Sequence, residues 1–286
     1  MPLPVKKIYV SSRNAAPGSV SSSNFNIQLA TSVELPQDTS FYLDDICIPH
    51  SWYAIEKGIN DQLYMSWQAD QFTLTANVTF AIITIPSQQY DGPGLLAALT
   101  TAFAAANLPS ATDFTWTYNQ TTNQLKLVCT TGLFYIYTDN DLTVGGALRF
   151  GTNAKWDPFN FHSINDCFPN YGTAQVINGV VTPAFYTGFL DLLTFHNIYI
   201  TSANLGTFTT IGPRGEGNII RKVPVTAPFG VMIVDRVTGV QKDYLDCSRQ
   251  SLKNIEFQFR DSRGNDIPLH GAAVSFTIVF VKSPED

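Results

Sequence analysis

The chain is poor in charged residues and has no long apolar run. Charged residues make up 14% of its 286 positions, against about 25% in a typical soluble protein. No apolar stretch approaches the roughly 18 residues that a membrane-spanning helix needs. The first residues, MPLPVKK, lack the apolar core of a secretory signal. Together with a hydrophobic content of 44%, these features argue against a disordered chain, a coiled coil and a membrane-spanning protein.

Cysteine is also scarce, and its spacing fits neither a metal knuckle nor a redox pair. The four cysteines stand far apart, at Cys47, Cys129, Cys167 and Cys247. Cys47 and Cys129 lie in apolar, strand-like runs, so we predict buried free thiols. This pattern excludes a small disulfide-stapled scaffold and favours assembly in a reducing compartment.

The net charge of −6 is unevenly distributed. Residues 1–33 carry Lys6, Lys7 and Arg13 and no acid, whereas residues 34–145 carry eleven acids against two lysines. No stripe of basic residues interleaved with aromatics occurs, so we expect no specific nucleic-acid binding. The basic start has two interpretations, a solvated tail or an arm that contacts an acidic partner. Lys6, Lys7 and Arg13 are therefore the candidate assembly arm.

Aromatic residues, at 13%, and alternating apolar positions indicate strands at both ends of the chain. Residues 24–29, with the sequence NFNIQL, have the alternation of a strand with one buried face. Residues 273–281 read as a long buried closing strand. The motif Asp261-Ser-Arg-Gly-Asn predicts a turn shortly before it.

The stretch 86–155 differs in character and predicts a small α/β lobe. A helix is expected from about Gly94 to Ala106, capped by Asp91 or Gly92, with an apolar stripe at four-residue spacing formed by Leu95, Leu99 and Phe103. A hairpin is expected across residues 119–123. The predicted division is thus a β domain of residues 1–85 and 156–286, with residues 86–155 inserted.

The residues that enzymes use are present but not grouped by any motif. The four histidines, His50, His162, His196 and His270, show neither metal-ligand spacing nor an accompanying nucleophile motif. Asp44 and Asp45 are neighbours, so on a regular strand they point to opposite faces unless a bulge re-aims one. Asp243 and Asp246 read as turn acids. We therefore predict no catalytic, cofactor-binding or metal-binding residues, no cofactor and no enzymatic activity.

Three groups of short motifs, in this order along the chain, resemble the penton (minor capsid) proteins of polinton-like viruses, virophages and related adenovirus-like lineages. The first comprises Ser11-Ser-Arg-Asn, Phe25-Asn-Ile-Gln-Leu and Ile48-Pro-His-Ser-Trp-Tyr. The second comprises Ile83-Thr-Ile-Pro-Ser-Gln-Gln-Tyr, Tyr118-Asn-Gln-Thr-Thr-Asn-Gln-Leu and Leu148-Arg-Phe-Gly. The third comprises Leu252-Lys-Asn-Ile-Glu-Phe, Asp261-Ser-Arg-Gly-Asn-Asp-Ile and Leu269-His-Gly.

The resemblance implies an all-β fold, a single jelly-roll sandwich with the small α/β lobe inserted. It also implies a homopentamer that closes the fivefold vertices of an icosahedral shell, among trimers of a double jelly-roll major capsid protein. The implied location is the virion, assembled inside the host cell. A chain of 286 residues suits one jelly roll better than two, which favours the minor capsid role.

Two other functions compete with this hypothesis. One is a carbohydrate-binding jelly roll of lectin or glycosidase type, in which Trp52-Tyr53 or Trp156-Asp157 would supply an exposed aromatic platform beside an acid. The other is a trimeric viral fibre or receptor-binding protein. The number of copies in the assembled protein separates these alternatives.

Overall fold

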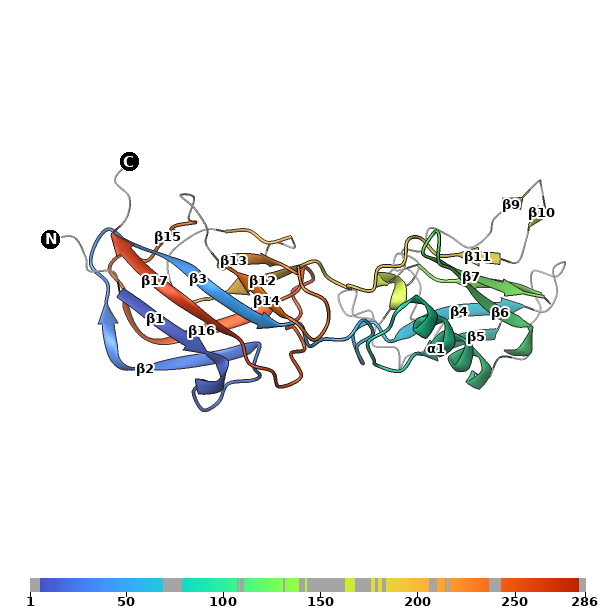
Figure 1. The fold of residues 1–286 in the computed structure, drawn as a ribbon, viewed down its shortest axis with the longest axis horizontal. Helices are drawn as coiled ribbons and strands as arrows, with labels where there is room; N and C mark the ends of the chain where they lie inside the picture. Colours follow the sequence, from blue (N-terminus) through green and yellow to red (C-terminus); the bar gives the residue numbers. More distant parts are fainter. Residues whose placement is uncertain are drawn as a thin grey trace. The chain divides into compact units, whose positions relative to one another are not determined.

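The computed structural model divides the chain into two compact units (Figure 1). The first, here called the sandwich unit, comprises Met1–Trp52 and Phe195–Asp286, and the second, the inserted unit, comprises Tyr53–Thr194. The structure describes residues 6–68, 79–106, 108, 111–130, 132–138, 142, 163–167, 176–177, 180–181, 184–205, 210–213, 215, 217–236 and 243–282.

The sandwich unit contains two antiparallel sheets (Figure 1). The first has the order β1-β17-β3-β14, with bounds Lys6–Ser11, Ser275–Lys282, Thr39–Pro49 and Met232–Asp235, and the short β15 (Leu245–Asp246) also pairs with β3. The second has the order β13-β12-β16-β2, with bounds Ile219–Pro224, Asn197–Thr201, Ser251–Arg260 and Asn24–Glu34. A 3-10 turn, Ser12–Asn14, follows β1.

The strand order is that of a jelly roll. Leaving aside the two-residue β15 and numbering the other eight strands along the chain, the first sheet holds strands 1, 8, 3 and 6 and the second holds 5, 4, 7 and 2. The chain therefore crosses repeatedly between the sheets, and its first and last strands pair side by side. This is the arrangement of two Greek keys wrapped into a double-sheet sandwich. The predicted all-β, jelly-roll fold is confirmed.

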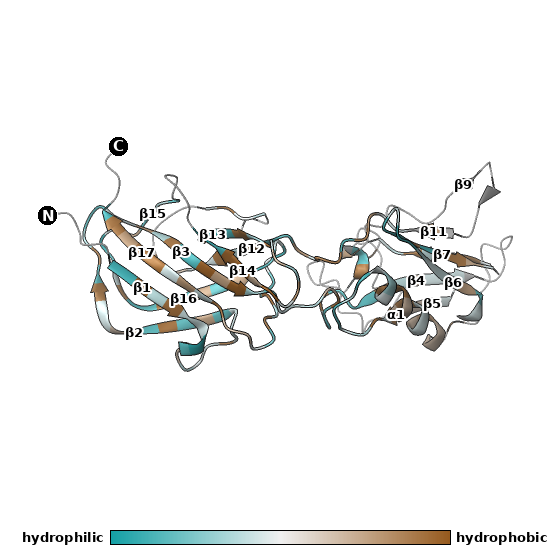
Figure 2. Cartoon of the chain, viewed as in Figure 1, coloured by the Kyte–Doolittle hydropathy of each residue, from teal (hydrophilic) through white to brown (hydrophobic). Residues whose placement is uncertain are grey.

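Phenylalanine rings fill the space between the two sheets. Phe25 lies 5.7 Å from Phe257, and Phe257 lies 4.9 Å from Phe276, measured between ring centroids. Phe41 packs against Phe280 in the same core. Phe25 and Phe257 alternate with more exposed residues along β2 and β16, whereas Phe41, Phe276 and Phe280 lie in fully buried runs of β3 and β17; Figure 2 shows the hydrophobic positions of these strands. Part of the aromatic content of the chain thus lies in the sandwich core.

The inserted unit lies in the connection between β3 and β12, and it has a separate core. Its two larger sheets have the orders β11-β7-β6 and β5-β4-β8, and a small pair β9-β10 completes the described strands. The bounds are β4 Gln62–Gln68, β5 Thr79–Thr84, β6 Phe114–Asn119, β7 Gln124–Cys129, β8 Leu133–Ile136, β9 Val176–Ile177, β10 Val180–Val181 and β11 Ala184–Tyr186, with 3-10 turns at Ala111–Asp113 and Ile164–Asp166.

The predicted helix is present as α1, Gly92–Ala105. The Asp91 carboxylate caps it by accepting a hydrogen bond from the Gly94 N–H at 2.7 Å. The predicted stripe of Leu95, Leu99 and Phe103 is fully buried, and the Phe103 ring packs against Phe114 and Trp116 of β6. The predicted hairpin is also present, because β6 pairs with β7 across the residues between Asn119 and Gln124.

The boundaries of the insertion differ from the expected 86–155. Strands β4 and β5, assigned from the sequence to the domain of residues 1–85, belong to the inserted unit, where Leu63 and Ile83 are buried in its core. At the other end, β11 pairs with β7 and Phe185 enters the same core. The sandwich therefore consists of residues 1–52 and 195–286. Alternation marks a buried strand face without saying which core covers it.

Candidate functional site: exposed edges of the sandwich

The basic residues at the start of the chain lie on the first strand of the sandwich. Lys6 and Lys7 belong to β1 and pair with Phe280 and Val279 of β17. Arg13 lies in the 3-10 turn that follows. All three side chains are exposed, so the candidate assembly arm is an edge strand with its adjoining turn and not a free tail. Val10 on the same strand is 4% exposed and anchors β1 in the core.

The opposite edge of the same sheet carries exposed apolar side chains. β14 places Ile233 in the core, yet Met232 and Val234, which face the other way, are 46% and 48% exposed. Figure 2 shows this strand as mainly hydrophobic. Val231 and Phe229, just before β14, are exposed as well. Sequence analysis missed this surface, although an apolar strand without polar alternation was the available signal.

The loop before β14 is held firmly by the end of β3. The His50 N–H donates to the carbonyl of Val231 at 3.1 Å, and the His50 carbonyl accepts from the Gly230 N–H at 2.8 Å. The His50 ring also bonds through Nδ1 to the carbonyl of Ala227 at 2.7 Å. The exposed apolar residues therefore stand on a fixed backbone.

Carboxylates surround the apolar strand. Arg221 of β13 bonds Asp235 through both Nε and Nη2, at 2.9 and 3.2 Å, and its Nη1 lies 3.2 Å from Asp243. The hydrogen bond to Asp235 is the largest cause of a pKa of Arg221 above its ordinary value. Asp243 keeps 80% of its side chain exposed.

Asp44 and Asp45 lie at a bulge in β3. The register with β17 shifts here. Asp44 pairs with Thr277 and Cys47 pairs with Ser275, so β3 advances by one residue more than β17 between the two pairs. Asp45 has φ 49°, in the left-handed region that aspartate tolerates better than most residues. Its carboxylate pairs with Arg236 at 3.1 Å. The bulge that the sequence analysis named as the exception is thus present, and it turns Asp45 toward an arginine.

The aromatic platform required for sugar binding is not formed by Trp52. Its ring stacks on His50 at 4.2 Å and on Phe195 at 4.9 Å, between ring centroids, and it is 1% exposed. Burial also lowers the pKa of His50, since it disfavours the charged imidazolium. The second candidate platform, Trp156-Asp157, lies outside the described residues, as does His162.

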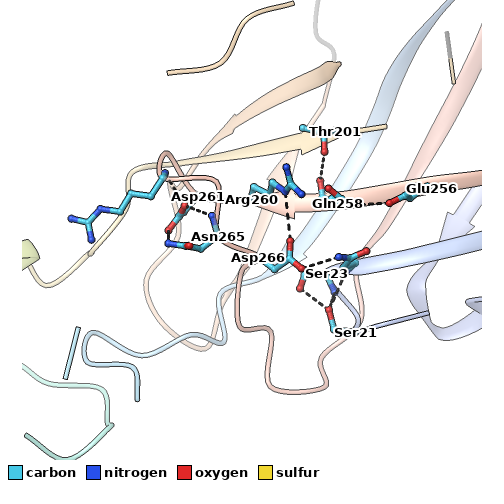
Figure 3. Close-up of polar contacts among 11 residues, drawn as sticks. Ser21, Ser23, Thr201, Glu256, Gln258, Arg260, Asp261, Asn265 and Asp266 are labelled. Atoms are coloured by element: carbon cyan, nitrogen blue, oxygen red, sulfur yellow. Dashed lines mark hydrogen bonds and ion pairs between the residues drawn. The ribbon is translucent and has the colours of Figure 1, made fainter. Parts of the chain in front are cut away.

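The predicted turn at Asp261 directly follows β16, and a neighbouring residue of the turn contacts the start of β2 (Figure 3). The Asp261 carboxylate accepts hydrogen bonds from the N–H groups of Arg263 and Asn265, at 2.7 and 2.9 Å. Asp266 accepts from the Asn24 side chain at 2.9 Å and lies 3.6 Å from Arg260. These contacts are structural, and they close one end of the sandwich.

Neither the thiols nor the carboxylates of the described residues gather into a metal centre. The four cysteines are free; Cys129 is buried as predicted, Cys47 is only half-buried, and Cys167 and Cys247 are buried as well. Within the described ranges, no group of three or more histidine, cysteine or acidic residues could hold a metal ion. None of the helices in the same ranges is long and apolar enough to cross a membrane.

A solved viral protein is similar to this chain in fold. The mavirus penton protein, in its crystal structure, matches with a TM-score of 0.50 and 10% sequence identity, over 98% of this chain and 99% of that chain. The fold is that of a penton protein. A chain in the cryo-EM structure of the Sputnik virophage is 15% identical, with a TM-score of 0.40, and covers 97% of this chain and 98% of that chain. No family model and no curated protein matches the sequence.

Proposed function

We propose that the protein is a structural capsid protein of the penton type, which forms homopentamers that close the fivefold vertices of an icosahedral shell. The observation that carries this proposal is the jelly-roll strand order together with the similarity in fold to the mavirus penton protein over nearly the whole chain. The partners are four further copies of the chain and trimers of a double jelly-roll major capsid protein. The location is the virion, assembled inside the host cell.

The surface chemistry supports an assembly role over a catalytic one. Only 14% of the residues are charged, so few charged side chains are available for the surface of a chain of this size. The cores of protein interfaces are likewise depleted in charge. The described carboxylates Asp45, Asp235 and Asp243 are engaged by arginines. The buried Trp52 offers no stacking face to a sugar. Among the described residues, no observation favours the carbohydrate-binding alternative.

Native mass spectrometry of the purified protein tests the proposal, because the competing functions differ in copy number. We expect pentamers at micromolar concentration. A trimer would support the fibre or receptor-binding alternative, and a monomer would contradict assembly by this chain alone. Co-expression with the major capsid protein, followed by imaging of the particles, tests whether the vertices are occupied.

We propose that the candidate assembly arm, formed by Lys6, Lys7 and Arg13, contacts an acidic surface in the shell. Removal of residues 1–14 would not test this contact, because it would delete β1 and the buried Val10. Arg13→Glu instead changes one exposed charge outside the strand. We expect it to reduce incorporation into particles while the fold, followed by circular dichroism, stays unchanged. Normal incorporation of this variant would contradict an acidic partner at that position.

A further inference from the structure

We propose that copies in the ring meet edge to edge, with the β1 edge of one copy against the β14–β15 edge of the next. The β1 edge is defined by Lys6, Lys7 and Tyr9. The β14–β15 edge is defined by Met232, Val234, Asp235, Asp243 and Asp246. This inference rests on the proposed homopentamer and deepens it by naming the two surfaces and their partner, a second copy of this chain.

The two edges lie at opposite ends of one sheet. β1 and β14 are the outer strands of the order β1-β17-β3-β14, and no strand of the described residues pairs with their outer sides. β15 lies on the same side of β3 as β14, because β17 occupies the other side of Ser40 and Phe41. A contact between two different edges is head-to-tail, and such contacts form closed rings when the rotation closes.

Each edge presents an exposed apolar surface. Tyr9 on β1 is 78% exposed and faces the same way as Thr277, its partner on β17. Val234 and Met232 present apolar side chains on the opposite edge, at 48% and 46% exposure. Soluble proteins usually protect edge strands with charge or proline; β1 has this charge in Lys6 and Lys7, whereas the exposed Met232 and Val234 of β14 indicate a partner. Tyrosine and methionine are enriched in protein interfaces.

The edges carry opposite charge, which identifies the partner as the other edge of a second copy. The β1 edge carries Lys6 and Lys7 and lies within residues 1–33, which contain no acid. Around the β14–β15 edge, four carboxylates stand against three guanidinium groups, leaving one negative charge: Asp45, Asp235, Asp243 and Asp246 against Arg221, Arg236 and Arg249.

This charge pattern selects between the possible pairings. Two β1 edges together would oppose Lys6 and Lys7 to themselves, and two β14–β15 edges would oppose carboxylates to carboxylates. Like charges across an interface disfavour those symmetric pairings, whereas the mixed pairing is attractive. The mixed pairing is the one that leads to a ring instead of an isolated twofold dimer.

Charge reversal tests the contact directly. The variant Lys6→Glu/Lys7→Glu makes the β1 edge acidic, and Asp243→Lys/Asp246→Lys makes the other edge basic. We expect each to weaken ring formation about tenfold or more at low salt, since attraction becomes repulsion at two exposed positions. The variant with all four changes restores complementarity, so it should form pentamers again. Native mass spectrometry across a dilution series measures all three.

Lys253→Glu is the matched control. Lys253 is exposed on β16, in the other sheet, so its reversal should leave the ring intact. Pentamers that persist in both edge variants would overturn the edge contact while leaving the proposed pentamer standing. A variant that carries all four substitutions, is folded and stays monomeric would also overturn the edge contact. A wild-type monomer would instead contradict the proposed pentamer itself, and the edge contact with it.

Discussion

Replacing Leu99 by alanine should destabilise the inserted unit by about 3–5 kcal/mol. Leu99 lies in the middle of α1, is 0% exposed, and shares its core with Leu95 and Phe103. The change removes three side-chain carbons, worth roughly 2.4 kcal/mol of transfer free energy at about 0.8 kcal/mol each. The cavity left beneath the helix adds the remainder, because the closely packed strands around the cavity can relax into it only partly.

Urea unfolding, followed by circular dichroism and tryptophan fluorescence, measures this change. The matched control is Thr100→Ala on the next, exposed position of the helix. Its hydroxyl donates only to the Leu96 carbonyl one turn earlier, at 2.8 Å, so the free energy of unfolding should change by less than about 0.5 kcal/mol. A neutral Leu99→Ala, or equal effects of the two substitutions, would refute the packing of α1 on its sheet.

Two further predictions concern buried titratable groups. Burial raises the pKa of the Cys167 thiol to about 12, so a chain whose other cysteines are serine should react with a thiol reagent at pH 8 only after urea unfolding; rapid labelling of the folded protein would contradict it. Burial lowers the pKa of His50, so the unfolded chain binds the proton more readily. The stability that depends on neutral His50 should be fully present above the unfolded pKa of about 6.5 and should fall as the pH drops toward the folded pKa. The urea midpoint should therefore decrease more between pH 7.5 and 5.5 for wild type than for His50→Gln, and equal decreases would contradict the assignment.

The elements with local signals could be predicted from the sequence. The helix depends on the Asp91 cap and on the four-residue spacing of its buried side chains, and both act within a few residues. The hairpin of β6 and β7 likewise depends on a short turn between two alternating segments. The jelly roll was reached through the resemblance of motifs, because pairing the first strand with the last joins residues more than 260 positions apart.

The unit boundaries and the assembly edges could not be predicted in the same way. Leu63 and Ile83 have the alternation of sandwich strands, and only the pairing of β4 with β8 shows that they face another core. Lys6 and Lys7 read as a tail because an exposed edge strand and a solvated arm present the same charges. Their place is set by pairing with β17, which lies at the far end of the chain.

The two cores are built from different parts of the chain. The buried residues of the sandwich core all come from residues 1–52 and 195–286, and those of the inserted core all come from residues 53–194. At the point where the chain leaves and re-enters the sandwich, Trp52 stacks on Phe195. The two ends of the connection between β3 and β12 are therefore held together by a contact between residues of the sandwich unit. Both edges proposed to form the ring belong to strands of the sandwich.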